Sequence, residues 1–156
     1  MQFKKFTLTE FSFKNSEHYK LVKQLEQVEG INYVSKELSN FVKESKHSEK
    51  IIPGNTYVIE NNDKDLVGLL GFMDLDRCGN LEIWTIINPY YRGKHYASMT
   101  LGTIVPYMIE NVDGLNDIKL VIQKNNENSK QVAISNGFNE VERIDDKDVY
   151  YYFKSK

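Results

Sequence analysis

Apolar residues recur along the chain at two different spacings, and these spacings predict its helices and strands. Between residues 17 and 28 the apolar side chains recur every three residues, as on one face of a helix: Tyr19, Val22, Leu25 and Val28. Ser16 precedes this segment as a candidate N-cap, and Gly30 follows it as a candidate end. Similar spacing predicts a second helix over residues 34–46.

Short segments that are rich in β-branched and aromatic residues and bounded by turn residues are typical of strands. The segments that meet this description are residues 2–9, 56–60, 66–75, 81–87, 118–123, 138–144 and 149–153. Asn61-Asn62-Asp63 and Asp145-Asp146 lie between successive segments and predict the turns of two hairpins.

Helical spacing returns over residues 96–110, where the apolar positions are Tyr96, Met99, Thr103, Ile104, Tyr107 and Met108. Pro106 lies inside this segment, where it removes a hydrogen bond and crowds the carbonyl of Gly102. Because glycine gives the backbone freedom to adjust, we expect one kinked helix here and not two. A short helix is predicted over residues 129–136, with Gly137 as its left-handed stop. The order β-α-α-β-β-β-α-β-α-β-β is that of an α+β protein with a mixed sheet.

Composition places the chain among ordinary globular proteins and excludes several classes of function. With 156 residues, 40% hydrophobic and 27% charged, residues 1–156 are expected to form a single domain. A net charge of −2 argues against a nucleic-acid partner, and no apolar run is long enough for a membrane partner. The single Cys78 and three histidines exclude a disulfide and disfavour a metal site. The first residues resemble no export signal, so the expected compartment is the cytoplasm.

A basic turn, Tyr91-Arg92-Gly93-Lys94-His95-Tyr96-Ala97, stands where the strand over residues 81–87 gives way to the helix over residues 96–110. The first N–H groups of a helix lack partners within the helix, and the helix dipole places partial positive charge there. Arg92 and Lys94 add full charges, and His95 is a third candidate cation. The segment therefore predicts a phosphate site, with a solvated basic turn as the alternative.

Arg92-Gly93-Lys94-His95-Tyr96-Ala97 resembles the pyrophosphate loop of the GNAT superfamily, the acyl-CoA-dependent N-acyltransferases. The loop of that family reads Arg or Gln, two residues, Gly, one residue, then Gly or Ala, so His95 stands where glycine is preferred. Asn126-Glu127-Asn128-Ser129 followed by Gly137-Phe138 is similar to the start and end of the family's next helix. The resemblance covers roughly residues 56–153, and two motifs in the right order are more specific than either alone.

The resemblance implies a GNAT-like fold: a mixed, mostly antiparallel central sheet, splayed between two central strands and flanked by helices. It also implies an N-acetyltransferase that uses acetyl-CoA as co-substrate. In that fold, backbone groups of one strand would bind the pantetheine arm and polarise the thioester, and the basic turn and the next helix start would complete the cofactor site. By position these residues are Thr85, Ile86, Ile87, Arg92, Gly93, Lys94, His95, Tyr96, Ala97 and Asn126.

Two residues are candidates for proton transfer. Glu82 shares a strand face with Trp84, which would partly desolvate the carboxylate and favour its use as a base; the alternative is a surface glutamate. Ser129 is a candidate proton donor, although a serine at a helix start is commonly a cap. Many family members carry a tyrosine acid at the position of Ala133, and we expect this small residue to leave room for a larger acceptor.

The acceptor is bounded by the cost of deprotonating it. An α-amine has a pKa of about 7.7–8.0 and a lysine about 10.4, so a low-pKa primary amine suits a site without the tyrosine acid. A protein N-terminus and a small-molecule amine both fit, and the segment after Ala133 is similar to the branch that includes ribosomal-protein N-terminal acetyltransferases. The alternatives are a non-catalytic acyl-CoA-binding or regulatory module and a partner-binding domain that keeps only the fold. The oligomeric state stays open, with a homodimer as one option.

Overall fold

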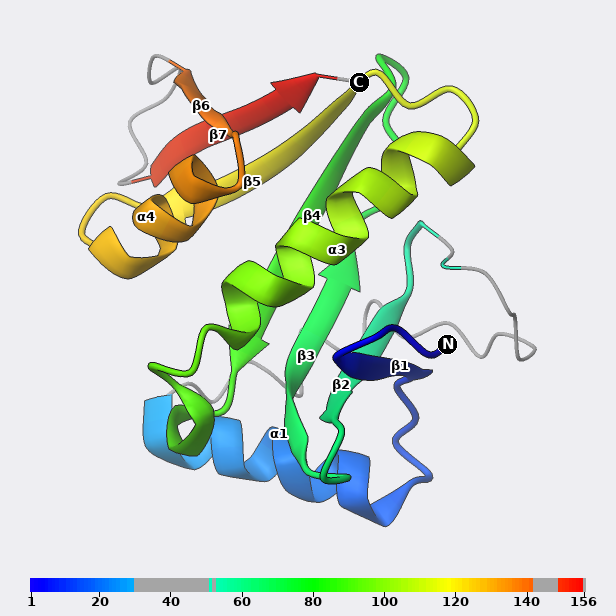
Figure 1. The fold of residues 1–156 in the computed structure, drawn as a ribbon, viewed down its shortest axis with the longest axis vertical. Helices are drawn as coiled ribbons and strands as arrows, with labels where there is room; N and C mark the ends of the chain where they lie inside the picture. The colour runs from blue at the N-terminus through cyan, green and yellow to red at the C-terminus, as the bar shows by residue number, and fades with distance from the viewer. Residues whose placement is uncertain (30–50, 52, 142–148, 156) are drawn as a thin grey trace. The chain divides into compact units, whose positions relative to one another are not determined.

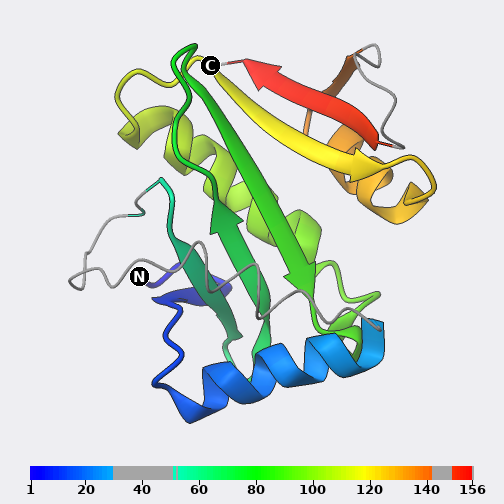
Figure 2. The same ribbon diagram turned by 180° about the vertical axis from the view of Figure 1, so that it is seen from behind.

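The computed structural model describes residues 1–29, 51, 53–141 and 149–155, which form two compact units. The first unit is Met1–Phe72 with Thr85–Tyr96, and the second is Met73–Trp84 with Ala97–Lys156. The elements, drawn in Figures 1 and 2, are β1 (Phe6–Glu10), α1 (Ser16–Glu29), β2 (Thr56–Asn61), β3 (Leu66–Phe72), β4 (Asn80–Ile87), the 3-10 helix η1 (Pro89–Tyr91), α3 (Tyr96–Asn111), β5 (Asp117–Gln123), α4 (Glu127–Ser135), β6 (Asn139–Val141) and β7 (Val149–Ser155).

The first unit is built on an antiparallel sheet in which β2 lies between β1 and β3, with the end of β4 on the other side of β3. Leu8 of β1 pairs with Ile59 of β2, and Tyr57 of β2 pairs with Leu70 of β3. Both faces of β2 and β3 are largely buried, so β3 and the middle of β2 read as continuous apolar runs and not as alternating ones. The unit's buried core includes Phe6, Leu8, Leu25, Val58, Ile59 and Leu69.

Helix α1 begins one residue away from the expected position of its cap. The side-chain Oδ1 of Asn15 accepts hydrogen bonds from the N–H groups of Glu17 (3.0 Å) and His18 (3.2 Å), so Asn15 and not Ser16 caps the helix. The buried face is His18, Leu21, Val22 and Leu25, whereas Tyr19 is 44% exposed, because a helix buries positions three and four apart. The expected end at Gly30 and the helix expected over residues 34–46 lie outside the described residues.

In the second unit, β5 lies between the start of β4 and β7, and β6 pairs with the far edge of β7. The β4–β5 pair is parallel and joins Asn80–Glu82 to Asp117–Lys119; among the described residues no pairing of these strands extends further. Ile118, Leu120 and Ile122 are buried as the alternation predicts, and Figures 1 and 2 show α4 on one side of the β5–β7 pair. The expected turn at Asp145-Asp146 lies outside the described residues.

The prediction of one helix around Pro106 is confirmed, because α3 runs from Tyr96 to Asn111 with the proline inside. Its buried side chains are Thr100, Leu101, Ile104, Val105 and Met108. Of the apolar positions given by the spacing, Ile104 and Met108 are therefore buried, whereas Tyr96, Met99, Thr103 and Tyr107 are half-buried. Gly102 lets α3 lie close to the end of α4, since a Cβ at this position would be only 3.1 Å from Oδ1 of Asn136, the C-cap of α4. Gly137 has a φ of +81°, which confirms it as the left-handed stop.

His18 makes the stability of the first unit sensitive to acid. It is 5% exposed, its Nδ1 accepts the N–H of Ser12 (3.2 Å), and its ring stacks on Phe11. Burial lowers the pKa of His18, and the charge of Glu60 opposes this only in part. The contribution of neutral His18 to the free energy of unfolding is therefore fully present above the ordinary histidine pKa of about 6.5. It is lost as the pH falls through the lower pKa of the folded state.

We therefore expect the thermal midpoint of the wild type to fall more steeply than that of His18→Gln between about pH 7.5 and about pH 5. Glutamine keeps an acceptor for the Ser12 N–H but does not titrate. Parallel curves for the two proteins, measured by circular dichroism, would contradict the assignment.

Candidate functional site

The basic turn leaves β4 through a tightly bonded junction at Asn88. Asn88 is 3% exposed, and its N–H donates to the carbonyl of Val67 at 2.8 Å. Its side-chain Oδ1 accepts the N–H of Tyr90 (3.2 Å), which caps η1, and its Nδ2 donates to Oε1 of Gln24 on α1 (3.4 Å). Asn88-Pro89 thus ends β4 and also sets the direction in which the following residues leave the strand.

The backbone of the loop Arg92–His95 has an uncommon conformation. Gly93 has a φ of +76° and His95 a φ of +62°, with Lys94 between them. Among the described residues, the N–H groups of Gly93, Lys94 and His95 have no hydrogen-bond acceptor, and all three residues are exposed. Successive N–H groups in alternating backbone conformations form a concave anion-binding surface. His95 keeps this conformation without glycine, since histidine enters the left-handed region more readily than most residues.

The side chains of the loop make contacts that hold it in place. Nε of Arg92 donates to the carbonyl of Ile87 (3.3 Å), and Nζ of Lys94 lies 5.4 Å from the ring centroid of Tyr91. The rings of Tyr91 and Tyr96 meet edge to face with centroids 6.2 Å apart. Two cations therefore lie beside the unpaired N–H groups, as an anion site requires.

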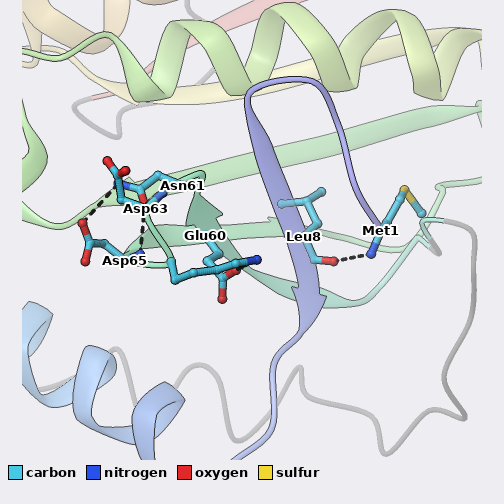
Figure 3. A network of polar contacts seen from close by, with 7 residues as sticks. Met1, Leu8, Glu60, Asn61, Asp63 and Asp65 are labelled. Carbon is cyan, nitrogen blue, oxygen red and sulfur yellow. Dashed lines mark hydrogen bonds and ion pairs between the residues drawn. The ribbon is translucent and has the colours of Figure 1, made fainter.

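The β2–β3 turn is hydrogen-bonded to Tyr96, and its Asp65 lines the same cleft as Tyr91. Nδ2 of Asn61 donates to the hydroxyl of Tyr96 (3.2 Å) and to Oδ2 of Asp65 (3.3 Å). Burial raises the pKa of Tyr91, and the negative charge of Asp65 nearby raises it further. Figure 3 shows Asn61, Asp63 and Asp65 gathered in this turn. The turn residues predicted this turn, but nothing in the sequence indicated that it bonds to Tyr96, 35 residues further along the chain.

A cleft of about 330 Å³ lies beside the loop in the first unit. Its lining comes from α1, from the β2–β3 turn and from the end of β4 with η1: Glu17, Lys20, Leu21, Gln24, Lys64, Asp65, Leu66, Asn88, Tyr90 and Tyr91. The sequence carried no signal of this cleft, because its walls come from three separate segments.

The strand residues predicted to bind the pantetheine arm lie in the first unit with the loop. Thr85 donates through Oγ1 to the carbonyl of Leu69 (3.1 Å), and the carbonyl of Ile87 accepts from Arg92. The backbone at Ile86 comes so close to Gly68 that a Cβ there would lie 2.4 Å from the Ile86 carbonyl oxygen. Only glycine allows this approach, so Gly68 places β3 against the strand that leads into the loop.

The remaining predicted site residues lie in the second unit. Glu82 forms an ion pair with Lys119, its partner in the β4–β5 register, at 3.2 Å. Asn126 caps α4 by accepting the N–H of Ser129 (3.1 Å), and Ser129 is half-buried. Ala97 is half-buried in the first turn of α3. In the structure Glu82 thus has a cationic partner and Asn126 has a capping role. These contacts do not determine whether either residue acts on a substrate.

The expectation of open space beside Ala133 is wrong, because this side chain is 0% exposed. It is the buried residue of α4, and the chain closes the helix there, with the N–H of Phe138 donating to the Ala133 carbonyl (3.1 Å). Among the described residues, no three His, Cys, Asp or Glu side chains are grouped to hold a metal ion. Nor does any described helix combine the length and apolarity of a membrane span.

The sequence profile described as "Acetyltransferase (GNAT) domain" matches residues 11–139. No curated protein matches the chain. Among solved structures, an acetyltransferase (GNAT family) from Bacillus anthracis is 20% identical, with a TM-score of 0.72 and coverage of 97% of this chain and 95% of its own. A chimera of the spermidine N-acetyltransferase SpeG from Vibrio cholerae and hSSAT is 17% identical, with a TM-score of 0.70 and coverage of 96% and 94%. The N-acetyltransferase PseH from Campylobacter jejuni is 19% identical, with a TM-score of 0.67 and coverage of 97% and 98%.

These likenesses establish the fold, and the expected α+β architecture with a mixed, mostly antiparallel sheet is confirmed.

The positive φ of His95 leads to a prediction about stability. His95→Gly should keep or slightly raise the free energy of unfolding, because glycine carries no Cβ penalty in the left-handed region. His95→Val should lower it by about 1–2 kcal/mol, since a β-branched side chain is poorly tolerated there. Lys94→Val is the matched control at an exposed neighbour without positive φ. Equal losses in the two valine variants, measured by denaturant titration, would contradict the interpretation.

Proposed function

We propose which acetyl donor and which class of acceptor this chain uses. The chain belongs to the GNAT family of acetyltransferases and transfers an acetyl group to an amine. The donor is acetyl-CoA, whose pyrophosphate is held by residues Arg92–Ala97, that is, by the loop Arg92–His95 and the first two residues of α3. The acceptor is a primary amine, and a small-molecule amine is favoured over a protein N-terminus. The observation that carries the donor site is the run of exposed N–H groups at Gly93, Lys94 and His95.

The chemistry of a pyrophosphate fits this loop. Its oxygens accept hydrogen bonds and carry negative charge, and three consecutive N–H groups with Arg92 and Lys94 beside them offer donors and positive charge. The first residue of α3 follows His95 directly, so the positive end of the helix dipole adds to the site. Ala97 and Asn126 are proposed to complete the cofactor contacts.

Acetyl-CoA supplies the acetyl group as a thioester. We assign to a backbone N–H within Thr85–Ile87 the task of donating to the thioester oxygen, where negative charge develops during acyl transfer. Glu82 is proposed to take the proton of the incoming amine, and Ser129 to supply a proton toward the sulfur. Lys119 holds the Glu82 carboxylate in one place at 3.2 Å, which limits the directions from which an amine can approach it.

Two observations support a small-molecule acceptor. Ala133 is fully buried, so the reason for expecting a large acceptor there is removed. Two of the structures with this fold are named as N-acetyltransferases, and one of them acts on spermidine by its name; this is an analogy of fold. We also propose that residues 1–156 work as a single N-acetyltransferase domain, because the family profile spans residues of both compact units.

The alternative is a non-catalytic acyl-CoA-binding module. It is favoured by Ala133, since the position of the family's tyrosine acid here carries no proton donor. General acid help is worth about 10²- to 10⁴-fold, so its loss predicts slower turnover without excluding it.

Ligand binding is the first test. CoA and desulfo-CoA should both raise the thermal midpoint, because a ligand that binds only the folded state stabilises it by about 2.7 kcal/mol at a hundred times its Kd. Pantetheine, which lacks the pyrophosphate, should raise it much less. Lys94→Gln should weaken CoA binding, and Lys4→Gln, which removes an equal exposed charge elsewhere, should not. No shift with millimolar CoA would overturn the donor site.

Turnover separates the enzyme from the binding module. Thiol release from acetyl-CoA should proceed steadily with primary amines, and kcat/KM should be higher for polyamines and other small amines than for a peptide with a free N-terminus. CoA binding without any amine-dependent thiol release would favour the non-catalytic module.

His95 leads to a separate prediction for the donor site. His95→Gly should keep or tighten CoA affinity, because it removes a side chain from the approach to the phosphates while glycine keeps the positive φ. Isothermal titration with CoA measures this. A loss of tenfold or more, about 1.4 kcal/mol, would show that the imidazole itself binds phosphate.

A further inference from the structure

We infer that Asn61 is a positioning residue for the acetyl donor: the β2–β3 turn, Asn61–Asp65, holds the loop Arg92–His95 in its anion-binding conformation through Tyr96, against which Tyr91 packs. The inference rests on the proposed role of the loop and adds to it the residues that hold the loop in shape.

Asn61 is buried, 6% exposed, and its side chain uses every hydrogen bond it can make. Its Oδ1 accepts the N–H groups of Asp63 (3.0 Å) and Asp65 (2.9 Å). Its Nδ2 donates to the Asp65 carboxylate (3.3 Å) and to the Tyr96 hydroxyl (3.2 Å). An asparagine has two acceptor sites and two donor hydrogens, so the rotamer and the amide orientation are both determined. Asn61 is therefore a fixed point from which Tyr96 can be held.

The two tyrosines stand at opposite ends of the loop. Tyr91 is the residue before Arg92, and Tyr96 is the residue after His95. Asn61 of the turn donates to the Tyr96 hydroxyl, and the Tyr91 ring meets the Tyr96 ring edge to face. A loop of four residues whose last flanking residue is bonded to a rigid turn, and whose two flanking rings pack on each other, has few conformations open to it.

This loop needs such support because its bound conformation is costly. Fixing the backbone of each residue costs conformational entropy, and a non-glycine residue at positive φ adds to that cost. The N–H groups of Gly93, Lys94 and His95 contribute no hydrogen bonds to the loop, since these three have no acceptor among the described residues. A loop already held in shape binds its ligand without that ordering cost.

The turn acts on the loop and not on the ligand. Asn61 is too buried to reach a bound phosphate, and the carboxylates of Asp63 and Asp65 would repel one. Any effect of Asn61 on the donor must therefore pass through the tyrosines. This predicts a change in donor affinity with the chemical step left intact.

The experiment compares Asn61→Ala, Tyr96→Phe and the double variant, with Asn62→Ala as the matched control in the same turn, where the side chain is exposed. Tyr96→Phe should raise the Kd for desulfo-CoA about fivefold, as expected for one lost hydrogen bond of about 1 kcal/mol. Asn61→Ala should raise the KM for acetyl-CoA at least as much while kcat stays within about twofold, because only binding depends on the loop's order. The double variant should be less impaired than the product of the two single effects.

Comparing acetyl-CoA with a donor that lacks phosphates separates a positioning role from a merely structural one, because general damage to the fold would impair both donors. In Asn61→Ala, kcat/KM should fall for acetyl-CoA and stay unchanged for S-acetylpantetheine. Equal losses for both donors, or a fall in kcat at unchanged KM, would overturn the inference, as would wild-type affinity in Tyr96→Phe. If Asn61→Ala does not fold, Tyr96→Phe tests the same hydrogen bond from its other end. Failure of the wild type to bind CoA would instead overturn the proposed donor site.

Discussion

The left-handed backbone at Gly93 and His95 is the constraint on which the candidate donor site depends. With φ values of +76° and +62°, these residues leave the successive N–H groups of Gly93, Lys94 and His95 without an acceptor among the described residues. The cost is highest at His95, which has a Cβ. The neighbouring contacts, from Arg92 on the Ile87 carbonyl to Tyr96 on Asn61, all act at or beside this short segment.

Asparagine side chains perform the same task at four junctions of the chain. Asn15 begins α1, Asn61 closes the β2–β3 turn, Asn88 begins η1 and Asn126 begins α4, each by accepting backbone N–H groups at Oδ1. Asparagine suits these places because its short side chain bonds nearby backbone groups that helices and turns leave unpaired. Asn61 and Asn88 go further, since their Nδ2 groups also reach residues distant in the sequence, at Tyr96 and Gln24. The same residue type thus ends an element and attaches it to another.

The family assignment does not by itself assign a role to each residue of the site. The profile match shows an acetyltransferase, whereas the proton-transfer roles of Glu82 and Ser129 depend on contacts that a bound donor and acceptor would make. Glu82 is engaged by Lys119, and the Ser129 N–H by Asn126, so both candidates already have structural partners. Their catalytic use is a proposal beside those structural roles.

The sequence by itself determined most of the element order, the class of the fold and the loop that resembles a pyrophosphate site. These are local properties: apolar spacing, turn residues and a short motif each depend on residues close together in the chain. The stop at Gly137 and the single helix through Pro106 followed from backbone chemistry alone. The burial of Ala133, the ion pair of Glu82 with Lys119, and the hydrogen bond from Asn61 to Tyr96 were decided only by the tertiary structure. Each depends on which distant segment packs against the residue, and local spacing carries no record of that packing partner.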